Sequence, residues 1–349
     1  MVPLTHIAIP TLVRVKENAL DRVGIYLDRA AYKQVAVLIS EGMVAPIQDR
    51  LQRSLKDAGV ESSVWYEVVA NDLESAERFS RAFPDSVSAV VGTGGGKALD
   101  VAKYAAHLAG LPYYAVPTSL SNDGFCSPQS SLTVLGERRS LPATLPRGVI
   151  IDTGVCHTAP RMLTLSGVGD LVAKPTAVRD WKLAFHATGE TVDDFAALIS
   201  EGSFHAFRSH PKFDLEGIRL LATGLLLSGI AMEIAGSSRP ASEHLISHAL
   251  DRVSSRPRLH GLQVGVASYL VSLLKGENTK VIAELLEATG FWETIVADPF
   301  SLSEWREALR LAPTLKENFY TILSVPDQLA EAARLLTENA QLARCFGNE

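Results

Sequence analysis

The sequence has 349 residues, 47% hydrophobic and 21% charged, which predicts a soluble globular protein of two domains with a sizeable buried core. Its net charge of −6 argues against a nucleic-acid-binding protein, because neutralising phosphates requires clustered Lys and Arg. A small anionic substrate is still compatible with this charge, since a few local cations and a metal can outweigh the net charge of the chain.

Targeting signals and cysteine usage together predict a cytoplasmic protein. The first twenty residues lack the cationic start, apolar core and small-residue cleavage site of a secretory signal. Cys126, Cys156 and Cys345 are widely spaced and form no CxxC pair, which excludes a disulfide framework and a thiolate zinc site. The most apolar stretch, residues 220–235, is short for a bilayer and carries Glu233, so it indicates a buried helix and no membrane insertion.

The first half of the chain alternates strand and helix patterns. Short β-rich runs predict strands at 34–40, 62–68, 88–94, 112–117 and 147–153. Apolar residues three and four apart predict helices at 44–59, 73–83 and 97–110. This alternation favours an α/β fold with a mostly parallel sheet covered on both faces. Residues 131–141 alternate around a Leu-Gly-Glu centre, which predicts a hairpin added to that sheet.

Beyond about Pro160 only helical periodicity remains. Residues 165–187, 214–236 and 260–276 predict long helices, and the tail from 277 onward predicts short amphipathic ones. We therefore expect a domain built on the parallel sheet at 1–163 and an all-helical domain at 164–349. The cleft between two such domains is the natural place for a ligand.

A glycine-rich turn follows the predicted strand at 88–94 and precedes a helix. It contains Gly92, Gly94, Gly95 and Gly96 in the segment VVGTGGGKALD. Glycines let a backbone approach a ligand closely, and a helix N-terminus adds free N–H groups that suit a pyrophosphate. The pattern is neither GxGxxG nor a P-loop, so it predicts phosphate binding without the usual fingerprints, with a plain strand-to-helix turn as the alternative.

A second polar loop follows the strand at 112–117, at the edge where open α/β sheets bind ligands. Its short hydrogen-bonding residues are Thr118, Ser119, Ser121, Asn122 and Ser127. A surface loop has the same composition, and Asp123 in isolation would be a capping or turn residue. Glu41, just past the strand at 34–40, is positioned to accept a hydrogen bond from an adenosine ribose and would disfavour a 2′-phosphate on it. A solvated loop acid is the alternative.

The helical half carries a set of metal-ligand residue types. Asp170 follows two glycines on the first helix, His244 and His248 lie four apart on one helix face, and His260 begins the next helix. One carboxylate and two or three imidazoles suit zinc, nickel or iron. Taken singly, each of these histidines is more often a packed or surface residue.

Five segments in order resemble the iron-containing alcohol dehydrogenase and dehydroquinate synthase superfamily, and within it the sn-glycerol-1-phosphate dehydrogenases. They are GGGKALDVAK, PTSLSNDGFCSP, GVGDLVAKPTAVRDWKLA, GSSRPASEHLISHALD and HGLQVGV. The resemblance implies an N-terminal Rossmann-like domain and a C-terminal helical domain with the active site in the cleft. It also implies NAD(P) and one divalent metal, zinc foremost with nickel or iron as alternatives.

Residue roles carried over from this resemblance form three sets. The cofactor would bind Gly94, Gly95, Gly96, Lys97, Asp100, Thr118, Ser119, Ser121 and Ser127. The metal would bind Asp170, His244 and His260, and Asp123 and His248 would face the substrate as catalytic residues. Family members often read PASGxEH, whereas here PAS runs directly into Glu243 and His244. Arg239 beside this shortened loop is a possible phosphate partner, or else a surface or helix-capping arginine.

The resemblance implies hydride transfer between NAD(P)H and a small polyol phosphate, foremost the dihydroxyacetone phosphate and sn-glycerol-1-phosphate pair. The metal would polarise the reacting oxygen, and Asp123 or His248 would relay its proton. Three alternatives stay open: a polyol or alcohol dehydrogenase without phosphate, a sugar-phosphate cyclase of the dehydroquinate synthase type, and a non-catalytic nucleotide-binding protein. The expected partners are a small-molecule substrate and further copies of the chain in a homo-oligomer.

Overall fold

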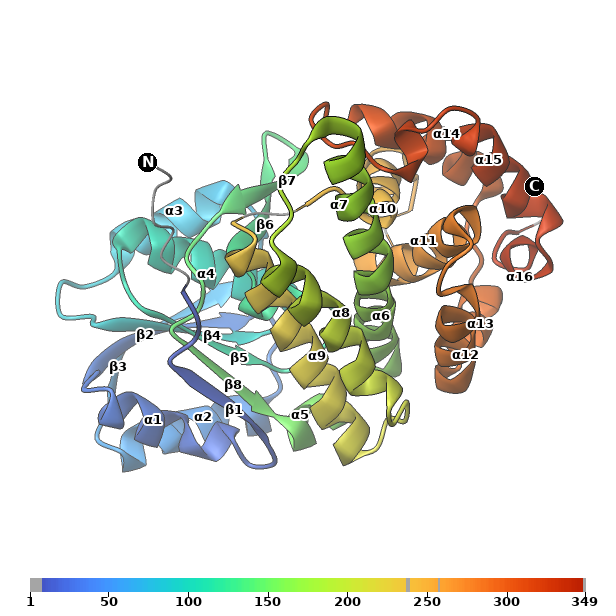
Figure 1. Ribbon diagram of the computed structural model, residues 1–349. Coiled ribbons are helices and arrows are strands. Elements are labelled where there is room, and N and C mark those ends of the chain that lie inside the picture. The colour runs from blue at the N-terminus through green and yellow to red at the C-terminus, as the bar shows by residue number, and fades with distance from the viewer. Residues whose placement is uncertain (1–7, 237–238, 257, 348–349) are drawn as a thin grey trace.

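The computed structural model describes residues 8–236, 239–256 and 258–347. A sheet covered by helices occupies the N-terminal part and a helical assembly the C-terminal part, with α6 to α9 between them (Figure 1). Six parallel strands run in the order β1-β8-β5-β4-β2-β3. Their bounds are β1 (Leu12–Lys16), β2 (Gln34–Ser40), β3 (Glu61–Val68), β4 (Ala89–Gly94), β5 (Tyr113–Pro117) and β8 (Gly148–Asp152).

The central strands are apolar because both faces of the sheet are covered. Every residue of β4, β5 and β8 is buried, as a strand between two helical layers requires. Leu51 and Leu55 of α2 (Ala45–Asp57) pack on one face together with α1 (Val23–Arg29). The other face is covered by α3 (Leu73–Ala82) and α4 (Gly96–Ala109). The α/β class, the five predicted strands and the three predicted helices are thereby confirmed.

The hairpin is confirmed as a hairpin, but its predicted place in the main sheet is wrong. β6 (Gln129–Val134) and β7 (Glu137–Pro142) form a separate two-stranded antiparallel sheet. The chain leaves the main sheet at β5, whose two edges are already paired with β4 and β8, so the hairpin cannot pair with the strand that precedes it. The Leu132 side chain of β6 is instead buried in the hydrophobic cluster that contains residues of α3 and α4.

The C-terminal part is helical, and between residues 153 and 347 the described chain holds no strand beyond one isolated bridge. Its helices are α5 (Thr153–His157), α6 (Arg161–Val172), α7 (Lys174–Thr188), α8 (Asp194–Arg208), α9 (Leu215–Ile234), α10 (Ser242–Val253), α11 (His260–Lys275), α12 (Thr279–Thr289), α13 (Phe291–Ala297), α14 (Leu302–Leu311), α15 (Gln328–Glu338) and α16 (Ala340–Ala343). The short 3-10 helices η3 (Ala312–Thr314) and η4 (Ile322–Ser324) lie between α14 and α15, and a further one, η1 (Leu20–Arg22), precedes α1 in the N-terminal part.

The apolar stretch at 220–235 belongs to α9, which confirms the predicted buried helix. Among the described residues α9 is the one helix long and apolar enough to cross a membrane, and more than half of its apolar window is buried inside the protein. Leu221, Leu225 and their neighbours pack against α6, α8 and the 3-10 helix η2 (Asp123–Cys126) as part of the largest core cluster. That cluster also contains Val149 and Ile151 of β8, so the two halves share a continuous core.

Candidate active site

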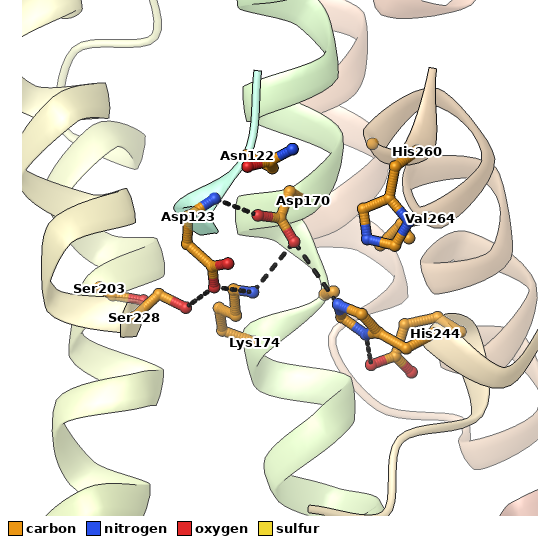
Figure 2. Close-up of polar contacts among 12 residues, drawn as sticks. Asn122, Asp123, Asp170, Lys174, Ser203, Ser228, His244, His260 and Val264 are labelled. Atoms are coloured by element: carbon orange, nitrogen blue, oxygen red, sulfur yellow. Dashed lines mark hydrogen bonds and ion pairs between the residues drawn. The ribbon is translucent and has the colours of Figure 1, made fainter. Parts of the chain in front are cut away.

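The loop after β5 places an acidic side chain in the interior. It leads into a 3-10 helix, η2 (Asp123–Cys126), whose first turn is capped by the Asn122 side chain. The N–H of Asp123 donates to Asp170 Oδ2 at 2.8 Å, and Ser228 Oγ donates to Asp123 Oδ2 at 2.6 Å. These two bonds hold the buried Asp123 carboxylate between α6 and α9 (Figure 2).

Glycines let the helices that carry the site approach each other closely. A Cβ on Gly169 would lie 1.8 Å from the carbonyl oxygen of Gly261, so α6 and α11 touch backbone to backbone at this point. Asp170 follows Gly169 in the chain, and His260 precedes Gly261. The close contact therefore brings Asp170 and His260, which lie ninety residues apart in the sequence, into one site.

The structure brings together the three residues that the resemblance implied as metal ligands. One potential ligand atom from each of Asp170, His244 and His260 lies within 4.8 Å of the other two. His244 Nε2 is 3.5 Å from Asp170 Oδ1, and the rings of His244 and His260 are 5.4 Å apart between centroids. Figure 2 shows both imidazoles and the Asp170 carboxylate converging from different helices.

Hydrogen bonds on the outer side of each ring determine which nitrogen faces the site. His244 Nδ1 donates to Glu243 Oε1 at 3.3 Å. Ser247 Oγ donates its hydrogen to Gln263 Oε1 at 2.7 Å. It therefore accepts the hydrogen bond from His260 Nδ1, which lies 2.9 Å away. Both histidines thus carry hydrogen on Nδ1, which directs Nε2 of His244 and of His260 to the common point. This is the usual way in which metal-binding histidines are oriented.

The donor set fits a divalent metal. A carboxylate with two imidazoles is a common ligand combination for zinc, nickel and iron. Burial would raise the pKa of Asp170, but the Lys174 ammonium and the bond from His244 hold it well below its ordinary value, so it is ionised. Burial, followed by the positive charge of His244, keeps the pKa of His260 well below its ordinary value, so its ring is a neutral donor.

Lys174 is a site residue that the sequence analysis missed. Its Nζ lies 3.1 Å from Asp123 Oδ2 and 3.1 Å from Asp170 Oδ1, and its side chain is almost fully buried. Burial alone would lower the pKa of Lys174, but the two carboxylates raise it above its ordinary value. The signal was present in the sequence, because Lys174 is four residues after Asp170 and therefore on the same helix face.

His248 lies beside the three candidate ligands rather than among them. Its ring is 6.0 Å from that of His260 between centroids, and burial, followed by the charges of His244, Lys316 and Arg138, lowers its pKa to about 3. His248 lines the pocket that also contains Asp123, His244 and His260. The structure therefore brings the two proposed catalytic residues, Asp123 and His248, to the same cavity as the candidate metal ligands.

The glycine turn lies at the carboxyl end of β4, next to β2 and β5. Gly94 has a φ of +138°, and a Cβ there would lie 2.0 Å from Ser40 Oγ, so only glycine fits. Gly95 is the N-cap of α4, and a Cβ added to it would meet nothing within 4 Å. A Cβ added to Gly96 would meet only the Asn122 side chain, at 4.0 Å. This open helix N-terminus can accept an anion. Lys97 is exposed and donates to the carbonyl oxygen of Val69 at 2.9 Å.

Thr118, Ser119 and Ser121 follow β5 at the same edge of the sheet. The N–H of Thr118 donates to the carbonyl oxygen of Gly94 at 3.0 Å, which joins this loop to the glycine turn. Ser119 is buried, while Thr118 and Ser121 are half-buried. Glu41 is exposed just past β2. Their roles toward a nucleotide stay predictions.

Two other residues assigned to the cofactor are held by internal contacts. Asp100 pairs with the buried Lys103 at 3.4 Å, and Lys103 also donates to the carbonyl oxygens of Gly124, at 2.7 Å, and Ser127, at 3.2 Å. Ser127 Oγ donates to the carbonyl oxygen of Gln129 at 3.0 Å. These bonds attach the η2 turn to α4. Asp100 and Ser127 also line the pocket, and their contact with a cofactor stays a prediction.

Comparisons with known proteins show the family and the fold of the chain. The profile of the iron-containing alcohol dehydrogenase family matches residues 14–160. The chain is 36% identical to the glycerol-1-phosphate dehydrogenase (NAD(P)+) of Aeropyrum pernix over 95% of this chain and 96% of that protein. It is 38% identical to the enzyme of the same name from Pyrococcus furiosus, over 81% of this chain and 83% of that protein. The crystal structure of glycerol dehydrogenase from Schizosaccharomyces pombe superposes with a TM-score of 0.73 at 20% identity, covering 96% of this chain and 90% of that one, which confirms the fold class.

Proposed function

Because the chain belongs to the glycerol-1-phosphate dehydrogenases of the iron-containing alcohol dehydrogenase family, we propose that it interconverts dihydroxyacetone phosphate and sn-glycerol-1-phosphate. The observation that carries the proposal is the convergence of Asp170, His244 and His260 beside Asp123 in one pocket. A carbonyl compound bound there would lie next to a site suited to a divalent cation and to a residue able to exchange a proton.

The residues that would hold the metal are Asp170, His244 and His260, and zinc is the ion we expect first. When bound there, a divalent ion supplies a positive charge that polarises the C2 oxygen of the substrate. Hydride chemistry belongs to the nicotinamide cofactor, so the protein contributes binding and orientation. The open N-terminus of α4 at Gly95 would bind the pyrophosphate of that cofactor.

Proton transfer is assigned to the groups on the Asp123 side of the pocket. Asp123 Oδ2 accepts hydrogen bonds from both Ser228 and Lys174, and we assign this carboxylate as the proton acceptor during alcohol oxidation. In ketone reduction the proton would move in the opposite direction, from the Asp123 and Lys174 side of the pocket to the substrate oxygen. His248, which lines the same pocket, is the second candidate for this relay.

The test follows the absorbance of NADH with purified protein supplied with zinc, nickel or iron. Dihydroxyacetone phosphate should be reduced with a higher kcat/KM than dihydroxyacetone, and sn-glycerol-1-phosphate should be oxidised where sn-glycerol-3-phosphate is not. Equal use of the phosphorylated and unphosphorylated ketones would overturn the proposed substrate and leave a polyol dehydrogenase. Tight NAD retention without net NADH turnover would indicate a cyclase instead. A cytoplasmic location and a homo-oligomeric state also stay predictions.

A further inference from the structure

Helix α4 carries a lysine in the interior of the N-terminal part. The Lys103 side chain is 1% exposed, and it is among the largest fully buried side chains of the described residues. Its Nζ lies 3.4 Å from Asp100 Oδ1. A buried ion pair of this kind is weak evidence for stability, because apolar residues of similar volume often stabilise a fold as well or better. The reason for a lysine at this position is therefore to be sought in the other contacts of its ammonium group.

Those other contacts lie at the end of the η2 turn. Lys103 Nζ donates to the carbonyl oxygens of Gly124, at 2.7 Å, and Ser127, at 3.2 Å. The last carbonyl oxygens of a helical segment lack partners within it, so a lysine ammonium is a suitable donor to them. The first residue of η2 is Asp123, to which proton transfer is assigned. Lys103 thus holds the C-terminal side of the turn that carries Asp123.

The helical part holds η2 on its other sides. The N–H of Asp123 donates to Asp170 of α6, and Ser228 of α9 donates to the Asp123 carboxylate. A Cβ on Gly229, also on α9, would lie 2.4 Å from the carbonyl oxygen of Cys126, so α9 contacts the backbone of η2 directly. Lys103 belongs instead to the sheet part of the protein. It therefore connects this turn, which is otherwise held by α6 and α9, to α4.

The other end of α4 is the proposed site of the cofactor pyrophosphate. Lys103 follows the N-cap Gly95 by eight residues, which is about two turns or roughly 12 Å along the helix axis. A helix is stiff over this length, so α4 fixes the distance between its open N-terminus and the turn of Asp123. Hydride transfer and proton transfer act on the same C–O group of the substrate, and both depend on the position of the donor and acceptor groups.

Asp100 is the partner of Lys103 on the same helix face. It lies three residues before Lys103, and its carboxylate is also hydrogen-bonded by the backbone of Ser131 in β6. The pair therefore attaches the β6–β7 hairpin to α4 as well as η2. These internal contacts offer Asp100 a role other than the cofactor contact that the family resemblance implied.

We propose, on the basis of the proposed function, that Lys103 and its partner Asp100 are positioning residues, which fix the turn of Asp123 relative to the cofactor helix α4. Through this connection the proton-transfer carboxylate and the cofactor address the same C–O group. The pair acts through Asp123, and Lys103 has no contact with the reacting atoms. The cofactor itself binds without Lys103, because the open N-terminus of α4 lies two turns away.

The test uses Lys103→Met in the full-length, metal-loaded protein. The kcat for reduction of dihydroxyacetone phosphate should fall about ten- to a hundredfold, as expected when a reacting group is displaced by about 1 Å. The KM for the ketone and the NADH affinity, measured by fluorescence titration, should stay within about twofold. The solvent deuterium isotope effect on kcat should increase, because proton transfer then limits the rate. Asp100→Asn, which keeps the shape of the side chain, should change kcat and the isotope effect in the same direction and serves as the test if Lys103→Met does not fold.

A matched control separates positioning from a purely structural role. Arg50 pairs at 2.8 Å with the buried Asp152 in the same half of the protein, outside the pocket, so Arg50→Met should lower the Tm and leave kcat within about twofold. Lys103 and Asp100 variants that behave like Arg50→Met, with kcat and the isotope effect unchanged, would overturn the positioning role and leave the proposed function intact. Weaker NADH binding with kcat retained would also overturn it, in favour of a cofactor contact. An unmodified protein that does not oxidise NADH with dihydroxyacetone phosphate would instead refute the proposed function.

Discussion

Replacing Gly95 by valine should disable cofactor binding while leaving the fold intact. Gly95 is the N-cap of α4 with φ −82° and ψ 178°, values that any residue can adopt, and a Cβ there meets nothing within 4 Å. The remaining cost to the fold is the poorer capping ability of valine, about 1 kcal/mol. For a protein of this size that corresponds to a lower Tm by roughly 1–2 °C.

The effect on the cofactor should be much larger than the effect on the fold. The valine side chain would occupy the open space in front of the free N–H groups of α4, where the pyrophosphate is proposed to lie. Losing one charge-assisted hydrogen bond costs roughly 1.5–3 kcal/mol. Since a factor of ten corresponds to about 1.4 kcal/mol, NADH should bind at least about tenfold more weakly, and a hundredfold or more if further contacts are lost.

Fluorescence titration with NADH measures this difference directly. Gly202→Val is the matched control, because a Cβ on Gly202 also meets nothing within 4 Å but Gly202 lies on α8, outside the glycine turn. An NADH affinity of the Gly95 variant within twofold of the unmodified protein would refute the pyrophosphate assignment. A Tm lowered by more than 10 °C would show instead that the space at Gly95 serves the fold.

Two further predictions concern the helical part. Asp170→Asn, His244→Ala and His260→Ala should each lose bound metal and turnover, as measured by elemental analysis and NADH absorbance; full metal content in all three would contradict the ligand assignment. Asp180→Ala should destabilise the fold by about 3–5 kcal/mol, because it removes the buried partner of Lys275, which lies 2.6 Å away and whose side chain is only 8% exposed. The double variant with Lys275→Met should unfold at higher denaturant concentration than Asp180→Ala alone, and an equal midpoint would show that the ion pair is not the cause.

Most of the sheet could be predicted because its central strands are continuous apolar runs. The strand β1 was missed, since it is a short run in which Arg14 and Lys16 interrupt the apolar residues and none of its five residues is fully buried. It lies at the edge of the sheet, where one side of the strand has no partner and the sequence is less constrained. The place of the hairpin was mispredicted for a related reason: alternation along a strand identifies a strand but not the sheet it joins.

The site was predicted less completely than the fold. Residue types and spacing pointed to Asp170 and the histidines as candidate ligands, but the choice of Asp170, His244 and His260 came from the family resemblance, because spacing alone does not bring three separate helices together. Ser228 was missed, since a serine on an apolar helix has no sequence signal for a partner 105 residues away. Ser247 could be seen only in the structure, where it sets the orientation of His260. Polar networks of this kind depend on packing, which periodicity does not encode.

The glycines of this chain serve the site in two physically different ways. Gly95 borders open space, so its missing side chain leaves room for a ligand. Gly169 and Gly261 border other backbone instead. A Cβ on Gly261 would lie 1.7 Å from the carbonyl oxygen of Ser166, which is a steric clash. The clash could be relieved only by moving α6 away from α11. Alanine at either position would therefore separate Asp170 from His260 although it touches neither side chain. The candidate metal site thus depends on two residues that offer no ligand atom, and a sequence search for ligand types alone would pass over both.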